Sequence, residues 1–208
     1  NQDFLYVADS QNNRVAVFDL ETKQVVQTIE NPDDDIFLTN RFTPLRVVVD
    51  RTGRLLVVAH NIFEGIMEFE PNGTFTRFYG TNTIQMNLLE ALIYRLSSKE
   101  QKEKMALRLQ PSFTSIDIDD FGYIYAVSSV DANSPVKKLN FKGRDILLNN
   151  GYINVVGDAK FETHNDKVVL GPSSITDVAV NADNNRFSIL DSKRGKIFTY
   201  DKEGHLLY

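Results

Sequence analysis

Histidines and carboxylates are the residues of this 208-residue chain that could bind a metal ion or transfer a proton. His60, His164 and His205 are far apart in the sequence, and no carboxylate is spaced so as to complete a zinc site with them. Asp117 and Asp177 occupy similar places in two apolar segments. A calcium ion would need six or more oxygen ligands, and no spaced loop supplies them. The sequence therefore predicts no metal site and no cofactor, with calcium as the alternative.

Several other chemistries find no support in the sequence. The chain has no cysteine, so disulfides and thiolate metal sites are excluded. No Gly-x-Ser-x-Gly or phosphate-binding loop motif occurs. The net charge of −5 and the pI of about 5.2 argue against nucleic-acid binding. The sequence contains no apolar run of about eighteen residues, the length that a membrane-spanning helix needs.

A short pattern, in which Asp, Glu or Asn stands three residues before Gly, follows apolar segments along the chain. It occurs in Phe69–Gly73, Leu139–Gly143 and Tyr200–Gly204, with a looser copy in Phe18–Thr22. A segment rich in Val, Ile, Leu or Tyr precedes each copy, as β-strands require. Repetition at a spacing of several tens of residues indicates a repeat architecture. The segments are Leu5–Asp9, Leu55–Ala59, Ile124–Ser128 and Phe187–Asp191.

Three copies have a further strand and tight turn in front of them, in Val47–Gly53, Ile116–Gly122 and Val178–Asn184. An Asp or Asn opens each turn, because its side chain can accept main-chain amides two residues later. The unit is then strand A, turn, strand B, loop, strand C, turn, strand D. Four short antiparallel strands in roughly forty residues are typical of a β-propeller blade.

The segment Phe4–Val15 resembles the core of an NHL repeat, and Asp191–Ile197 is a second match. The second and third copies depart from that repeat, since Ala59 and Ser128 replace its Asp. The resemblance covers the chain except near 81–110 and 149–171. It implies an all-β propeller of NHL type, similar to extracytoplasmic NHL proteins of Gram-positive bacteria that are found at the cell surface or anchored to the membrane.

The repeat divides one propeller domain over 1–208 into about four blades. NHL propellers resemble closed rings of six blades, so we expect this chain to be part of a longer protein, with an oligomer as the alternative. The predicted parts are blade 1 at 3–30, blade 2 at 44–80, a small two-helix insertion at 81–110, blade 3 at 112–148, an insertion at 149–171 and blade 4 at 173–208.

Every long loop falls at the same end of the predicted blades. The turns within strand pairs A–B and C–D are short, whereas the B–C loops and the connections between blades carry all the insertions. Because binding residues concentrate on loops that a rigid scaffold carries, we expect the functional face at this loop-bearing end. Strand A is innermost in such a blade, so Asp117 and Asp177 are predicted to line the central channel.

These features predict a non-catalytic binding or scaffolding propeller that recognises a protein or a carbohydrate. The alternative is a metal-dependent hydrolase or lyase of propeller type, similar to lactonases, with catalytic residues partly outside this chain. No catalytic residue is assigned. The candidate partner-binding residues follow from the phase of the repeat, and they are His60, Asn61, Phe63, Tyr79, Asn82, Tyr94, Tyr152 and His164.

Overall fold

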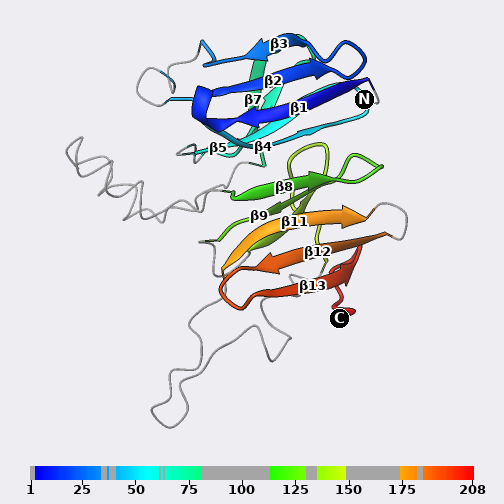
Figure 1. The fold of residues 1–208 in the computed structure, drawn as a ribbon. Coiled ribbons are helices and arrows are strands. Elements are labelled where there is room, and N and C mark those ends of the chain that lie inside the picture. The colour runs from blue at the N-terminus through cyan, green and yellow to red at the C-terminus, as the bar shows by residue number, and fades with distance from the viewer. Residues whose placement is uncertain are drawn as a thin grey trace, which may run out of the picture.

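A computed structural model of the chain describes residues 3–33, 37, 41–60, 62, 64–80, 113–129, 135–148, 174–181 and 185–208. This part of the chain is all-β, as predicted, and its strands form four antiparallel sheets in which neighbours in sequence pair with each other (Figure 1). The predicted two-helix insertion at 81–110 and the insertion at 149–171 lie outside the described residues. Among the residues described, no helix has the length and apolar character needed to cross a bilayer.

The strands begin and end close to the predicted positions. The first sheet contains β1 (Phe4–Asp9), β2 (Arg14–Asp19) and β3 (Val25–Ile29), with the short 3-10 helix η1 (Ser10–Asn12) after β1. The second contains β4 (Pro44–Val49), β5 (Leu55–Ala59), β6 (Ile66–Phe69) and β7 (Phe75–Tyr79). The third contains β8 (Ser115–Ile118), β9 (Ile124–Val127) and β10 (Val136–Leu139), and the fourth contains β11 (Ile175–Asn181), β12 (Arg186–Asp191) and β13 (Lys196–Asp201).

Acidic or amide side chains hold the tight turns that lie within the described residues, as the sequence predicts. The carboxylate of Asp119 accepts the amides of Phe121 and Tyr123 at 2.9 Å each. The amide of Gly122 donates to the carbonyl of Asp119 at 3.0 Å, and Gly122 has φ of 84°. Because side chains rarely tolerate that φ, glycine is the residue that closes the hairpin at low cost.

The four sheets pack face to face in sequence order, from the first (blue in Figure 1) to the fourth (orange and red). The continuous apolar run of β5 explains how one sheet contacts two neighbours. Leu55 and Val57 face the first sheet, and Leu56 and Val58 face the third. Successive strand residues point to opposite faces, so a sheet that is covered on both sides needs apolar residues throughout.

The predicted fourth strand is regular in the second sheet, whereas after β10 and β13 it is reduced to isolated bridges, Leu139 with Asp145 and Tyr200 with Leu206. The prediction of a full strand D in the third unit is therefore wrong. The carboxylate of Asp145 accepts the amide of Lys138 at 3.1 Å and that of Leu147 at 3.0 Å. A side chain thus takes the place of a main-chain carbonyl, and the strand ladder ends there.

Candidate functional site

Polar side chains from three sheets meet along the first strands of those sheets. Strands β4, β8 and β11 lie next to one another in turn. We call the set formed by Arg46 on β4, Ser115 and Asp117 on β8, and Asp177 on β11 the first-strand row. The sequence predicted Asp117 and Asp177 for this place, and it did not single out Arg46 or Ser115.

Asp177 is the centre of the first-strand row. Its Oδ1 accepts the hydroxyl of Ser115 at 2.5 Å, and its Oδ2 lies 3.7 Å from Nη2 of Arg46. The side chains of Arg46 and Asp177 are 48% and 46% exposed, so both can also contact a ligand from solvent. A guanidinium and a carboxylate from two sheets therefore lie half-exposed beside each other, and the buried hydroxyl of Ser115, from a third sheet, holds the carboxylate in place.

A β-bulge precedes each of the two half-exposed residues, Arg46 and Asp177. The register of β4 against β5 shifts between Pro44 and Arg46, and the register of β11 against β12 shifts between Ile175 and Asp177. A bulge inserts one residue and turns the following side chain away from the regular alternation, and bulges are frequent beside binding sites. Both half-exposed charged residues of the row therefore directly follow a bulge.

Asp117 has a different role, because its carboxylate accepts hydrogen bonds from main-chain amides. Oδ1 accepts the amide of Ile118 at 2.8 Å, and Oδ2 accepts the amide of Val180 on β11 at 2.7 Å. Burial raises the pKa of Asp117 above its ordinary value, and the neighbouring charge of Asp177 adds to this effect. Asp117 therefore connects the third sheet to the fourth and leaves the exposed carboxylate of the row to Asp177.

Hydrogen bonds also fix the strand ends beside the row. The hydroxyl of Ser10 in η1 donates to the carbonyl of Pro44 at 2.5 Å, and the hydroxyl of Thr43 donates to Oδ1 of Asn13 at 3.0 Å. The amide of His60 donates to the carbonyl of Thr43 at 2.8 Å. His60 is exposed and directly follows Ala59, which pairs with Pro44.

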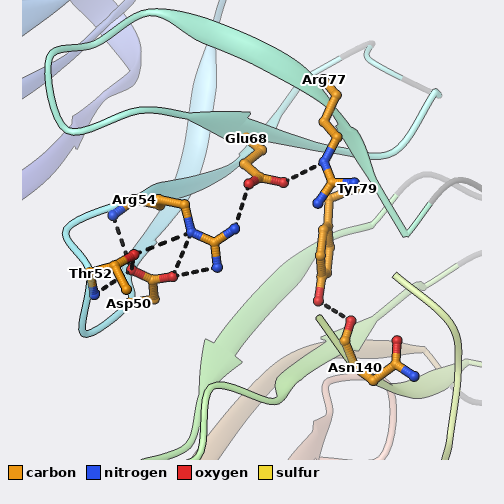
Figure 2. A network of polar contacts seen from close by, with 7 residues as sticks. All are labelled: Asp50, Thr52, Arg54, Glu68, Arg77, Tyr79 and Asn140. Carbon is orange, nitrogen blue, oxygen red and sulfur yellow. Dashed lines mark hydrogen bonds and ion pairs between the residues drawn. The ribbon is translucent and has the colours of Figure 1, made fainter. Parts of the chain in front are cut away.

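The sequence predicts that Tyr79 binds a partner, but the structure places its side chain between two sheets. Its side chain is buried at 4% exposure, and its hydroxyl donates to the main-chain carbonyl of Asn140 (Figure 2). Burial, together with the charge of Glu68, raises the pKa of Tyr79 to about 12. Tyr79 therefore ties the second sheet to the third instead of facing a partner.

Figure 2 also shows a buried ion-pair network on the second sheet that the sequence analysis missed. The carboxylate of Glu68 on β6 lies 2.7 Å from Nη1 of Arg54 and 2.8 Å from Nε of Arg77. Arg54 is in turn paired with Asp50 at 2.7 Å. Cross-strand pairing places Glu68 opposite Arg77, so this network stabilises the sheet.

Among the described residues, Asp201, Glu203 and His205 bring three groups of metal-ligand type within 4.8 Å of one another. They belong to the tight turn after β13. Oδ1 of Asp201 accepts the amides of Glu203 and His205 at 2.9 Å each, and Oδ2 lies 2.9 Å from Nδ1 of His205. These contacts explain the cluster as a hairpin turn.

The other predicted partner-binding residues lie outside the described part of the chain. They are Asn61, Phe63, Asn82, Tyr94, Tyr152 and His164.

Comparison with known proteins finds a similar fold and gives no information on activity. No protein-family model matches the chain, and no curated protein matches it. A solved structure of a protein of unknown function from Bacteroides caccae aligns with a TM-score of 0.50 at 13% sequence identity. The alignment covers 94% of this chain and 58% of that chain. A similarity at this level of identity shows the fold alone.

Proposed function

We propose that this chain is a β-propeller of NHL type that acts as a non-catalytic recognition module at a bacterial cell surface. The four sheets are then successive blades, and β4, β8 and β11 are inner strands that line the channel. Three features support this arrangement: each sheet is a sequential meander, the sheets pack in chain order, and their first strands adjoin.

The observation that carries the recognition role is the half-exposed pair of Arg46 and Asp177 from two sheets, with the carboxylate of Asp177 held by the buried hydroxyl of Ser115 from a third. Their strands are held by bonds between sheets, so the row is preorganised, and preorganisation lowers the entropic cost of binding. The loops at the same end, including His60, would surround a ligand that docks on the row.

Of the two ligand classes that the sequence leaves open, we favour a carbohydrate. A sugar hydroxyl both donates and accepts hydrogen bonds, and neighbouring hydroxyls match a guanidinium beside a carboxylate. A protein interface usually centres on a buried aromatic or aliphatic anchor, and none of the four residues of the row is of that kind.

The experiment is a screen of the chain on an oligosaccharide array, followed by calorimetry with the best binder. Arg46→Ala should weaken binding about tenfold or more, the loss of one charged hydrogen bond, without lowering Tm. The matched control is Arg51→Ala, because Arg51 and Asp120 form another exposed pair between the second and third sheets, at 3.3 Å and in the tight turns. Equal losses in both variants, or an array without binding, would refute carbohydrate recognition by the row.

A further inference from the structure

The first-strand row contains more negative than positive groups. Arg46 contributes a guanidinium, whereas Asp117 and Asp177 contribute two carboxylates, which are ionised above neutral pH. The two carboxylates are close enough to act on each other, since the charge of Asp177 adds to the raised pKa of Asp117. The row therefore carries a net negative charge.

Hydrogen bonds hold both carboxylates of the row in place. Ser115 and Asp117 are two residues apart, so they lie on the same face of β8, and both contact β11. Oδ2 of Asp117 accepts the amide of Val180. Oδ1 of Asp177 accepts the hydroxyl of Ser115 and, at 3.0 Å, the amide of Val178. Donors of this kind favour the ionised form of a carboxyl group, so the negative charges belong to the folded structure of the row.

Arg46 and Asp177 each keep a polar group for a ligand. Within the described residues, Oδ2 of Asp177 accepts no hydrogen bond, since its distance of 3.7 Å from Nη2 of Arg46 is too long for one. Nη1 of Arg46 donates to the carbonyl of Leu45 at 3.1 Å, which holds the guanidinium beside the carboxylate. A ligand hydroxyl can accept from Nη2 and donate to Oδ2. A ligand carboxylate has no hydrogen to donate to Oδ2.

We propose that the row selects uncharged oligosaccharides and rejects acidic ones, such as those built from uronic acids. This selection depends on the carbohydrate recognition proposed above and adds the class of sugar. Arg46 attracts an acidic group, but Asp177 lies 3.7 Å from that guanidinium and repels the same group. Asp117 on the adjoining strand adds a second repulsion. Because like charges that share a site oppose each other's ionisation, two carboxylates outweigh one guanidinium.

The test compares matched oligosaccharides above neutral pH. An array should carry neutral oligosaccharides and the same compounds with primary alcohols oxidised to carboxylates. The neutral member of each binding pair should give the stronger signal, and calorimetry at low salt should show the acidic member of the best pair bound about tenfold or more weaker. Added salt should leave the affinity for the neutral member nearly unchanged, because that ligand carries no charge to be screened.

Asp177→Asn separates the charge of the row from its shape. Asparagine keeps an oxygen for the hydroxyl of Ser115 and leaves Arg46 without its carboxylate. The variant should bind the neutral oligosaccharide more weakly, because the acceptor Oδ2 becomes a donor. It should bind the acidic one at least as well as the neutral one. The matched control is Asp120→Asn, which removes the carboxylate from the exposed pair with Arg51 and should keep the wild-type preference.

The outcomes separate this selection from carbohydrate recognition itself. Wild-type binding of the acidic member as tight as that of the neutral member would overturn the selection and leave carbohydrate recognition standing. A preference for the neutral member that Asp177→Asn retains would do the same, once circular dichroism has shown that the variant is folded. An array on which no oligosaccharide binds would remove both.

Discussion

Replacing Glu68 with glutamine should destabilise the second sheet much more than an exposed ion pair would suggest. The side chain of Glu68 is 4% exposed, and it accepts hydrogen bonds from both Arg54 and Arg77. A hydrogen bond to a charged group contributes about 1.5–3 kcal/mol. Glu68→Gln retains one acceptor oxygen but removes the charge and the second acceptor.

The loss of stability is smaller than for a fully buried pair, because the two arginine side chains are 36% and 49% exposed. Water can therefore solvate them once the carboxylate is gone. Removing one partner of a fully buried pair costs about 3–5 kcal/mol. For Glu68→Gln we therefore expect a loss of about 2 kcal/mol, or a Tm lower by about 4–8 °C for a chain of this size.

The measurement is urea unfolding followed by far-UV circular dichroism, since the chain has no tryptophan. Asp120→Asn is the control, because it breaks the exposed pair with Arg51 and should change the free energy of unfolding by no more than about 0.5 kcal/mol. High salt should alter the effect of Glu68→Gln little, because a buried pair is weakly screened. A loss as small as that of the control would refute the argument from burial.

Three further predictions concern turns and titrating groups. A Cβ on Gly143 would lie 2.7 Å from the main-chain nitrogen of Gly80, whereas one on Gly122 meets nothing within 4 Å, and both glycines have positive φ. Gly143→Ala should therefore cost about 1–3 kcal/mol more than Gly122→Ala in urea unfolding, and equal costs would contradict the packing of the second sheet on the third. Burial raises the pKa of Tyr79 to about 12, so stability should fall as pH rises from about 10 toward 12. Tyr79→Phe should flatten that fall, and an unchanged profile would show that another group causes it. Hydrogen bonds hold the pKa of Asp50 below its ordinary value, although burial acts to raise that pKa. The stability due to Asp50 is thus present above pH of about 4 and lost as pH falls through the lowered pKa. Asp50→Asn should reduce this acid loss, as measured by thermal melts across pH.

The strands and tight turns could be predicted because their causes are local. Asp119 and Gly122 close a hairpin through contacts within a few residues. The missing strand after β10 could not be predicted in the same way, because the side chain of Asp145 competes there for the amide of Lys138. Tyr79 was misplaced for a related reason: its partner, the carbonyl of Asn140, belongs to the turn of the next sheet.

Two residues of the first-strand row could be placed on their strands from the sequence. The phase of the repeat places Asp117 and Asp177 on first strands, and this needs only the order of the strands. Arg46 joins the row because a bulge precedes it, and Ser115 joins it because the third sheet adjoins the fourth and its hydroxyl donates to Asp177. Neither the position of a bulge nor the side-by-side arrangement of two sheets follows from the residue pattern of one strand.

The Asp at the end of strand B has a structural role in the first and fourth sheets. In the fourth sheet Asp191 is fully buried and accepts the amides of Ser174 and Lys193 at 3.2 and 3.1 Å. In the first sheet Asp9 accepts from Asn12 and Arg14, which fixes η1. The repeat Asp thus holds a short turn through its side chain.

The second and third sheets have Ala59 and Ser128 at this position. Main-chain bonds fix the strand ends there, from the amide of His60 to Thr43 and from that of Ser128 to Pro135, at 2.8 Å each. Without the Asp, the turn is not restricted to the short form, and the longer B–C loops of the chain follow these two strands. Arg46 pairs with Val58 and Ser115 pairs with Val127, the residues directly before Ala59 and Ser128. The departures from the repeat and the polar side chains of the row therefore lie at the same end of these two sheets, where we propose that a ligand binds.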